Sequence, residues 1–263
     1  MSTVESVSQF LGEVAPLALA ESWDNVGLLL GDRRSSVKRV MTCLTLSPST
    51  VGEAIQQQAD LVVAHHPLPF KPVGTITTDS YTGGLLWQLA SHQVAVYCPH
   101  TAWDSAARGV NAQLAKMLSL REVAPMQPSE VPGLEHCGAG RYGLTATEFS
   151  LDEFAGRVEQ LVPNSRMRFV DAGRMVQRVG IACGSGGSLL SLAVRSGCDT
   201  LLTGEATFHS CLEAEAAGVN LVMNGHYASE RFSLDQLATQ LSEQFPSLDV
   251  WASKNETDPV RNL

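Results

Sequence analysis

The sequence predicts an α/β fold built from two duplicated three-layer α/β/α halves with mixed, mostly parallel sheets. Short runs of apolar and β-branched residues, typical of buried strands, alternate with segments of helical periodicity, and this alternation is typical of sheets covered by helices. Two stretches of the chain also repeat each other at constant spacing, and histidines and carboxylates follow several of the apolar runs. These three observations define the expected architecture.

The repeat relates two predicted strand–helix–strand units. Arg39-Val40 opens the first unit and Asp60 lies near its end, while Arg178-Val179 and Asp199 occupy the same places in the second. The interval from Arg39 to Arg178 equals that from Asp60 to Asp199, so the two units match without a gap. The crossover helices are predicted at about residues 48–58 and 188–196. We therefore expect residues 39–66 and 178–205 to form matching βαβ units, each right-handed.

A second correspondence follows each unit. An apolar strand ends in His100 in the first copy and in His226 in the second, and an acidic residue lies four positions later in both. The interval between these histidines is shorter than the interval between the two βαβ units, so the first copy contains additional residues. We expect them in the loop of residues 67–84.

Two domains are expected, residues 1–125 with the histidine pair and residues 126–263. The C-terminal part of the second, about residues 221–263, should return ligands to a shared site. Residues 121–135 contain three prolines and a glycine and predict a linker near this boundary. Further helices are predicted at residues 1–20, 83–91, 110–118, 151–161 and 228–245, and the helix of residues 151–161 should be opened by a Ser150–Glu153 capping box.

Composition and charge exclude several classes of protein. Acidic residues outnumber basic ones by 27 to 18, and no basic run offsets the net charge of −9, so nucleic-acid binding is not predicted. No apolar run is long enough to span a membrane, and the N-terminus lacks a signal-peptide pattern. Six cysteines without C-x-x-C spacing favour reduced core thiols and a cytoplasmic location. The charged fraction of 17% is low and indicates burial in a homo-oligomer.

The most informative local feature is the pair His65-His66, which ends the apolar run of residues 59–64 and directly precedes Pro67. Proline cannot continue a sheet ladder, so the strand should end at the histidines, where open α/β sheets place their ligand sites. Side chains alternate along a strand, so the pair suits two metal ions, or one ion and a substrate, better than chelation of one ion. Two hydrogen-bonded turn histidines are an equally good interpretation of the pair alone.

Two further pairs carry metal-ligand chemistry, because His100 and Asp104, like His226 and Glu230, are four residues apart. Such residues share one face if the chain becomes helical directly after the strand. Imidazole and carboxylate ligands suit zinc, iron, manganese or nickel better than calcium, and carboxylates can bridge two ions. Each pair alone is better explained as a salt link at a helix start, but the two pairs together with His65-His66 favour a metal site.

Motifs along nearly the whole chain resemble the NIF-three-like family, whose members are also called GTP cyclohydrolase I type 2 homologues. The matching stretches are residues 23–28, 64–68 with 70–71, 100–104, 138–143, 202–205 and 225–230. The resemblance implies a duplicated α/β protein that assembles as a toroidal hexamer with a dinuclear metal site, that is, two divalent ions per chain. It further implies that the ligands are His65, His66, Asp104, His226 and Glu230. His100 is then expected beside the ligands or on the substrate.

Other residues are weaker candidates for the same site. His100 and Glu205, the repeat equivalent of His66, are candidates for moving a proton beside the catalytic carboxylate Glu230. Trp23, Asp24 and Asn25 are candidates for substrate binding, with a turn capped by Asp24 as the alternative. The glycine-rich turn could hold a phosphate at a helix N-terminus, but it lacks a Walker lysine, which favours a purely structural turn. Its glycines are Gly184, Gly186 and Gly187.

These features predict a metal-dependent hydrolase that acts on a small nucleotide-like or phosphorylated substrate. Two alternatives are a non-catalytic metal-binding or metal-handling protein and a regulatory interaction protein. An open coordination position in a concave, partly polar pocket favours the hydrolase, and a coordinatively closed site favours metal handling. A large exposed apolar patch outside the oligomer contacts favours the interaction protein.

Overall fold

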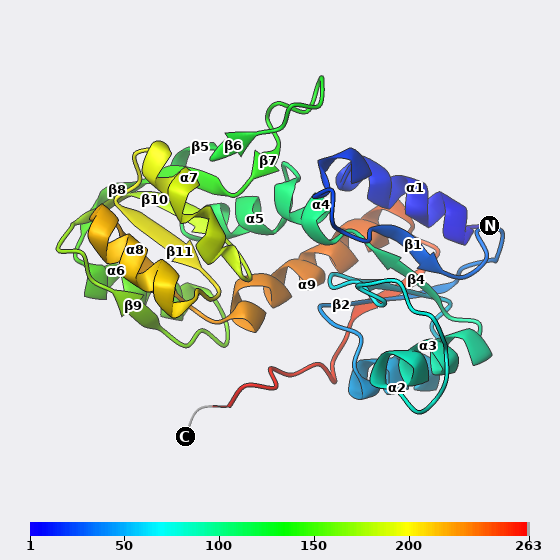
Figure 1. The fold of residues 1–263 in the computed structure, drawn as a ribbon. Helices are drawn as coiled ribbons and strands as arrows, with labels where there is room; N and C mark the ends of the chain where they lie inside the picture. Colours follow the sequence, from blue (N-terminus) through cyan, green and yellow to red (C-terminus); the bar gives the residue numbers. More distant parts are fainter. Residues whose placement is uncertain (262–263) are drawn as a thin grey trace. The chain divides into compact units, whose positions relative to one another are not determined.

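A computed structural model describes residues 1–261 of the chain, which divides into two compact units (Figure 1). The first unit comprises residues 1–103 and the chain from residue 233 onward, and the second comprises residues 104–232. The predicted halves, residues 1–125 and 126–263, differ from these units at their boundaries. The reason is that strand β13 (Asp249–Ala252) pairs with β2 (Arg39–Cys43) in the first sheet.

The first unit contains a five-stranded sheet in the order β1-β4-β3-β2-β13. Strand β1 (Gly27–Leu30) is antiparallel to β4 (Ala95–Cys98), whereas β4, β3 (Leu61–Ala64), β2 and β13 run parallel. Helices α2 (Pro48–Gln56) and α3 (Tyr81–Ser91) cover one face through a buried apolar core. The Thr42 hydroxyl donates to the Leu234 carbonyl, so α9 (His226–Gln244) lies against the opposite face.

The remaining elements of the first unit are short or peripheral. They are α1 (Val4–Val14), the 3₁₀ turn η1 (Leu17–Leu19) and α4 (His100–Ser105), whose last residues belong to the second unit. Beyond β13, the buried carboxylate of Glu53 on α2 accepts hydrogen bonds from the Ser253 hydroxyl at 2.7 Å and the Asn255 amide at 2.9 Å. These bonds anchor the C-terminal segment to the first unit.

The second unit contains a six-stranded sheet in the order β5-β8-β10-β11-β12-β9. The three central strands are parallel and the flanking pairs are antiparallel. Helices α5 and α6 share one core with the sheet, while α7 and α8 share another, so helices cover both faces. The strands are β5 (Arg121–Ala124), β8 (Arg141–Phe149), β9 (Arg168–Val170), β10 (Val176–Ala182), β11 (Thr200–Thr203) and β12 (Asn220–Met223), and the helices are α5 (Val110–Met117), α6 (Leu151–Leu161), η2 (Gly186–Leu189), α7 (Leu190–Arg195) and α8 (Phe208–Ala217).

The duplication is visible in the register of the strands. Val40 of β2 lies opposite Leu61 of β3, and Val179 of β10 lies opposite Thr200 of β11. The interval from Val40 to Val179 equals that from Leu61 to Thr200, as the repeat requires. The predicted match between the two βαβ units is therefore confirmed in strand order, direction and register.

An aspartate occupies the equivalent position just before the second strand of each βαβ unit. Asp60 accepts hydrogen bonds from the backbone amides of Lys38 and Arg39, at 2.7 and 2.9 Å. Asp199 accepts them from Gln177 and Arg178, at 3.0 and 2.7 Å. Each acidic residue thus satisfies two amides at the start of the first strand of its unit, which explains why an aspartate occupies both positions.

The second correspondence holds at the helix starts but not along the strands. Leu61 lies opposite Ala95 and Thr200 lies opposite Asn220, so Ala95 and Asn220 correspond in the two sheets. His100 and His226 begin α4 and α9. The interval from His100 to His226 is one position longer than the interval from Ala95 to Asn220. The second copy therefore has an extra residue between strand and helix, in a turn where Gly225 has a φ of 97°.

The predicted linker is wrong for its first part. Residues 121–124 form β5, the edge strand that pairs with β8, and β6 (Gln127–Pro128) pairs with β7 (Gly138–Ala139) in a separate two-stranded sheet. Proline is tolerated at sheet edges, so the prolines of this segment mark edges rather than a linker. The capping box at Ser150 and Glu153 is confirmed, and it opens α6 at Leu151.

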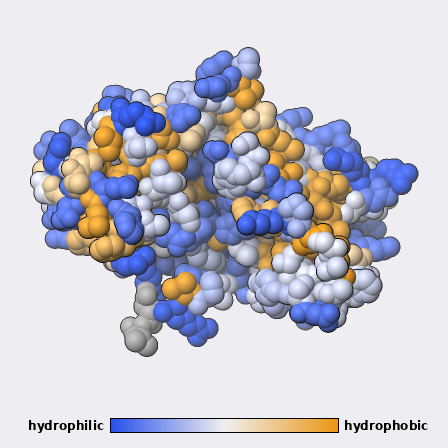
Figure 2. Space-filling model, viewed as in Figure 1, coloured by the Kyte–Doolittle hydropathy of each residue, from blue (hydrophilic) through white to orange (hydrophobic). Residues whose placement is uncertain are grey.

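The surface mixes hydrophobic and hydrophilic residues (Figure 2), and the cysteines are free thiols, as the composition predicted. Hydrophobic residues lie among hydrophilic ones on the face of both units drawn in Figure 2. Within residues 1–261, no helix is long and apolar enough to cross a membrane, and the cysteines form no disulfide.

Candidate metal centre

Three histidines of the first unit gather at the carboxyl ends of two parallel strands. His65 and His66 follow β3, and His100 begins α4 just after β4. One ring nitrogen from each lies within 4.8 Å of the other two. His65 is fully buried, whereas His66 and His100 are partly exposed. Three converging imidazoles are a donor set that suits a transition metal.

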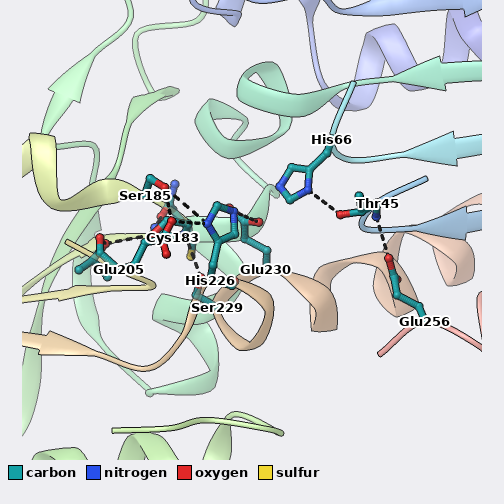
Figure 3. Close-up of polar contacts among 12 residues, drawn as sticks. Thr45, His66, Cys183, Ser185, Glu205, His226, Ser229, Glu230 and Glu256 are labelled. Carbon is teal, nitrogen blue, oxygen red and sulfur yellow. Dashed lines mark hydrogen bonds and ion pairs between the residues drawn. The ribbon is translucent and has the colours of Figure 1, made fainter. Parts of the chain in front are cut away.

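The rings of His65 and His66 converge, although strand alternation predicted that they point apart. Their centroids are 5.2 Å apart, and the centroid of His65 is 5.3 Å from that of His100. Because β3 ends at Ala64, the two histidines are no longer held to strand alternation. The Thr45 hydroxyl lies 2.7 Å from Nδ1 of His66 and orients its ring (Figure 3).

His100 is oriented by Asp24, whose Oδ1 lies 2.8 Å from its Nδ1. Burial raises the pKa of Asp24, but hydrogen bonds from His100 and Thr101 outweigh this effect and lower the pKa to about 2. Asp24 is therefore ionised at neutral pH, and with a proton on Nδ1 the other ring nitrogen, Nε2, can act as a base. His100 also has a φ of 25°, a strained backbone conformation of the kind that clusters at functional sites.

A second cluster forms in the second unit around His226, the first residue of α9 (Figure 3). Its Nδ1 lies 2.9 Å from Glu205 and its Nε2 lies 3.1 Å from Glu230. Ser185 donates a hydrogen bond of 2.6 Å to the same oxygen of Glu205. Burial lowers the pKa of His226, but the two carboxylates outweigh it and raise the pKa to about 9.

Asp104 joins this second cluster through Glu230. An oxygen of Asp104 and an oxygen of Glu230 lie within 4.8 Å of each other, and Glu230 is only 3% exposed. Burial and the charges of both carboxylates raise the pKa of the Cys183 thiol well above 9.0. Two carboxylates this close repel each other, and a cation between them would reduce that repulsion, so the arrangement is compatible with a bound divalent ion.

The glycine-rich turn has a packing role in the structure. The Gly184 amide donates to the Ser229 hydroxyl at 2.9 Å, and a side chain at residue 184 would strike the Glu230 carboxylate. Side chains at Gly186 and Gly187 would strike Ala182 and Ala206. Close packing thus accounts for all three glycines, while phosphate binding at this turn stays a prediction.

Of the remaining predicted site residues, Glu205 contacts His226 directly. The roles of Trp23 and Asn25 in substrate binding stay predictions. The sequence did not indicate Thr45 or Ser185, whose hydroxyls touch the clusters, because single hydroxyl residues give no sequence signal. Neither did it indicate the link from Asp24 to His100, which joins residues 76 positions apart.

Fold and clusters together define a duplicated α/β protein whose histidine and glutamate groups are compatible with metal binding. The chain belongs to the DUF34/NIF3 family (NGG1p interacting factor 3), whose family model matches residues 2–259. The resemblance predicted from the sequence motifs is therefore confirmed.

Individual relatives align over nearly the whole chain. A GTP cyclohydrolase 1 type 2 homolog from Clostridium perfringens is 28% identical over 97% of this chain and 98% of its own length. NIF3-like protein 1 of Drosophila melanogaster is 31% identical over 97% of this chain and 87% of its own length. Among solved structures, the Staphylococcus aureus hypothetical protein SA1388 is 27% identical in sequence to this chain. The structural alignment covers 99% of both chains with a TM-score of 0.89.

Proposed function

We propose that this protein is a metal-dependent hydrolase with a dinuclear site, acting on a small nucleotide-like or phosphorylated substrate. The observation that carries the proposal is that each compact unit holds its own donor group. These are His65 and His66, with His100 beside them, in the first unit and His226 with the carboxylates in the second. The ligands are His65, His66, Asp104, His226 and Glu230, and the ions are zinc, iron, manganese or nickel.

The relatives support hydrolysis as the reaction class. The similar protein of Clostridium perfringens is named a GTP cyclohydrolase 1 type 2 homolog, which makes GTP the first substrate to test. Divalent ions at such a site lower the pKa of a water molecule and polarise the group that is cleaved.

The residues of the chain have two kinds of task in this reaction. Glu205 accepts a hydrogen bond from Nδ1 of His226 and so directs Nε2 of the ring toward a ligand position. Carboxylates commonly orient metal-ligating histidines in this way. Asp24 fixes His100 in the same way, so that its Nε2 can accept a proton at the reacting oxygen and return it. Glu230 is catalytic in the sense that its charge holds the ions in place.

The test is turnover of a panel of nucleotides and phosphorylated metabolites, beginning with GTP, by metal-loaded protein. Glu230→Gln should keep the fold but lower turnover by about 100-fold or more, because a neutral amide is a poor ligand and lost activation of water costs several kcal/mol. Glu213→Gln, on the exposed side of α8, is the matched control and should turn over like wild type.

Two results would contradict this assignment. Equal rates for wild type, Glu230→Gln and chelator-treated protein would show that the hydrolysis does not depend on the metal. No turnover of any substrate by metal-loaded wild type would favour the metal-handling alternative.

A homo-hexamer is part of the same proposal, motivated by the family resemblance and by the low charged fraction of 17%. Sedimentation at micromolar concentration should give a species of several chains. A monomer under those conditions would rule the hexamer out.

A further inference from the structure

Two large aromatic side chains lie exposed near the histidine cluster of the first unit. Trp23 is 59% exposed and Phe70 is 46% exposed, and their ring centroids are 6.0 Å apart with the planes tilted by 60°. The rings therefore form a corner rather than a stack. A planar ring can lie flat on one of them and meet the other with its edge, which are the two favoured geometries of aromatic pairs.

Polar contacts hold this corner in place. The Asn25 side-chain amide donates to the Pro69 carbonyl at 2.7 Å and so joins the loop of Trp23 to the loop of Phe70. The Thr101 hydroxyl accepts a hydrogen bond from the Glu21 amide at 3.0 Å, and its neighbour His100 is bonded to Asp24. Loops fixed on both sides of the rings lose little entropy when a ligand binds, which favours a preorganised binding surface.

The corner also borders the proposed chemistry. The centroids of Trp23 and Phe70 lie 6.2 and 6.4 Å from the centroid of His100, and both meet that ring edge to face. The His100 centroid is in turn 5.3 Å from His65 and 5.7 Å from His66. A ring held on Trp23 and Phe70 thus lies beside the imidazoles of the first unit.

We infer that Trp23 and Phe70 form a stacking platform, so that the substrate carries a planar aromatic heterocycle and not merely a phosphate group. This inference rests on the proposed function, since it assigns the substrate class of the same site. Stacking accepts any ring with a π-face, so the platform selects for a ring without specifying which heterocycle.

The experiment compares ligands that share a phosphate and differ in the ring. Binding of GMP, AMP, CMP and ribose 5-phosphate to the metal-loaded protein is measured by calorimetry. At least one of the three nucleotides should bind about tenfold or more tightly than ribose 5-phosphate. Trp23→Ala and Phe70→Ala should each weaken that binding by about tenfold, as expected for loss of one stacked ring, and leave ribose 5-phosphate unchanged.

Two variants keep the test specific. Trp87→Ala removes a tryptophan that is 54% exposed on α3, and it should bind the nucleotide like wild type. Trp23→Tyr keeps an aromatic ring and should retain most of the affinity, which a merely structural role of the indole would not explain.

Binding is measured without turnover, so it separates the inference from the hydrolase proposal. Nucleotide binding that depends on Trp23 without any hydrolysis would leave the platform standing and remove the hydrolase. Equal binding of nucleotides and ribose 5-phosphate, equal effects of Trp23→Ala and Trp87→Ala, or no nucleotide binding at about millimolar concentration would overturn the inference.

Discussion

His226 lies between two carboxylates, and this arrangement couples metal binding to protons. Burial disfavours its imidazolium form, but Glu230 and Glu205 favour it more strongly and raise the pKa to about 9. At neutral pH the metal-free chain therefore carries a proton on His226. A metal ion that uses this ring as a ligand must displace that proton, because only the neutral imidazole ligates.

The first prediction concerns the pH dependence of metal affinity. A raised pKa means that the proton competes with the metal up to about pH 9, so the affinity for manganese(II) should increase between pH 7 and 9. A histidine with the ordinary pKa of 6.5 is mostly neutral at pH 7 and would show only a small increase in that range. Calorimetric titration in buffers of different ionisation enthalpy measures both the affinity and the released proton.

Glu205→Gln supplies the control for this prediction. It removes one of the two carboxylates that raise the pKa of His226, so the rise in affinity should move to lower pH. An affinity that stays constant from pH 7 to 9 in wild type would show that His226 is not a ligand.

For individual site residues, the sequence predicted the residue types but not their hydrogen-bond partners. The position of His65-His66 before Pro67 indicated a strand end with ligand chemistry, and the structure gathers both residues with His100. The orienting contacts of Asp24 and Thr45 could not be predicted, because they depend on loops that the tertiary fold brings together.

Among the elements, the two βαβ units are the best-predicted part of the fold. The constant spacing of the repeat predicted their matching register, and the structure adds the reason for the aspartates at their ends. Edge elements were predicted poorly. The antiparallel β5 was expected to be a linker, since an exposed strand beside prolines lacks the apolar pattern of a buried strand.

The second prediction uses the duplication as its own control. Asp60→Ala and Asp199→Ala each leave two backbone amides without their carboxylate partner. Each should lower the free energy of unfolding by about 2 kcal/mol, the scale of hydrogen bonds to a charged group. Urea unfolding measures the loss, and the exposed Asp79→Ala should change it by no more than about 0.5 kcal/mol. A loss for one aspartate and none for the other would contradict equivalent roles.

Across the whole molecule, the duplication relates the two βαβ units but does not extend to the ends of the chain. Strand β13 returns to the first sheet, and Glu53 anchors the segment that follows it, so the first unit is assembled from both ends of the chain. Sequence periodicity carries no information on which sheet a terminal strand joins, so the pairing of β13 with β2 was not predicted. The family model, by contrast, matches residues 2–259, and the motifs noted in the sequence lie within that range.

The central claim is that the chain binds two divalent metal ions through the proposed ligands, and metal content per chain tests it most directly. Elemental analysis of the protein after metal loading and gel filtration should give about two divalent ions per chain for wild type. His65→Ala in the first unit and Glu230→Gln in the second should each lower that number, because each removes a proposed ligand. Wild-type protein without stoichiometric metal, or variants with the same content as wild type, would contradict the account.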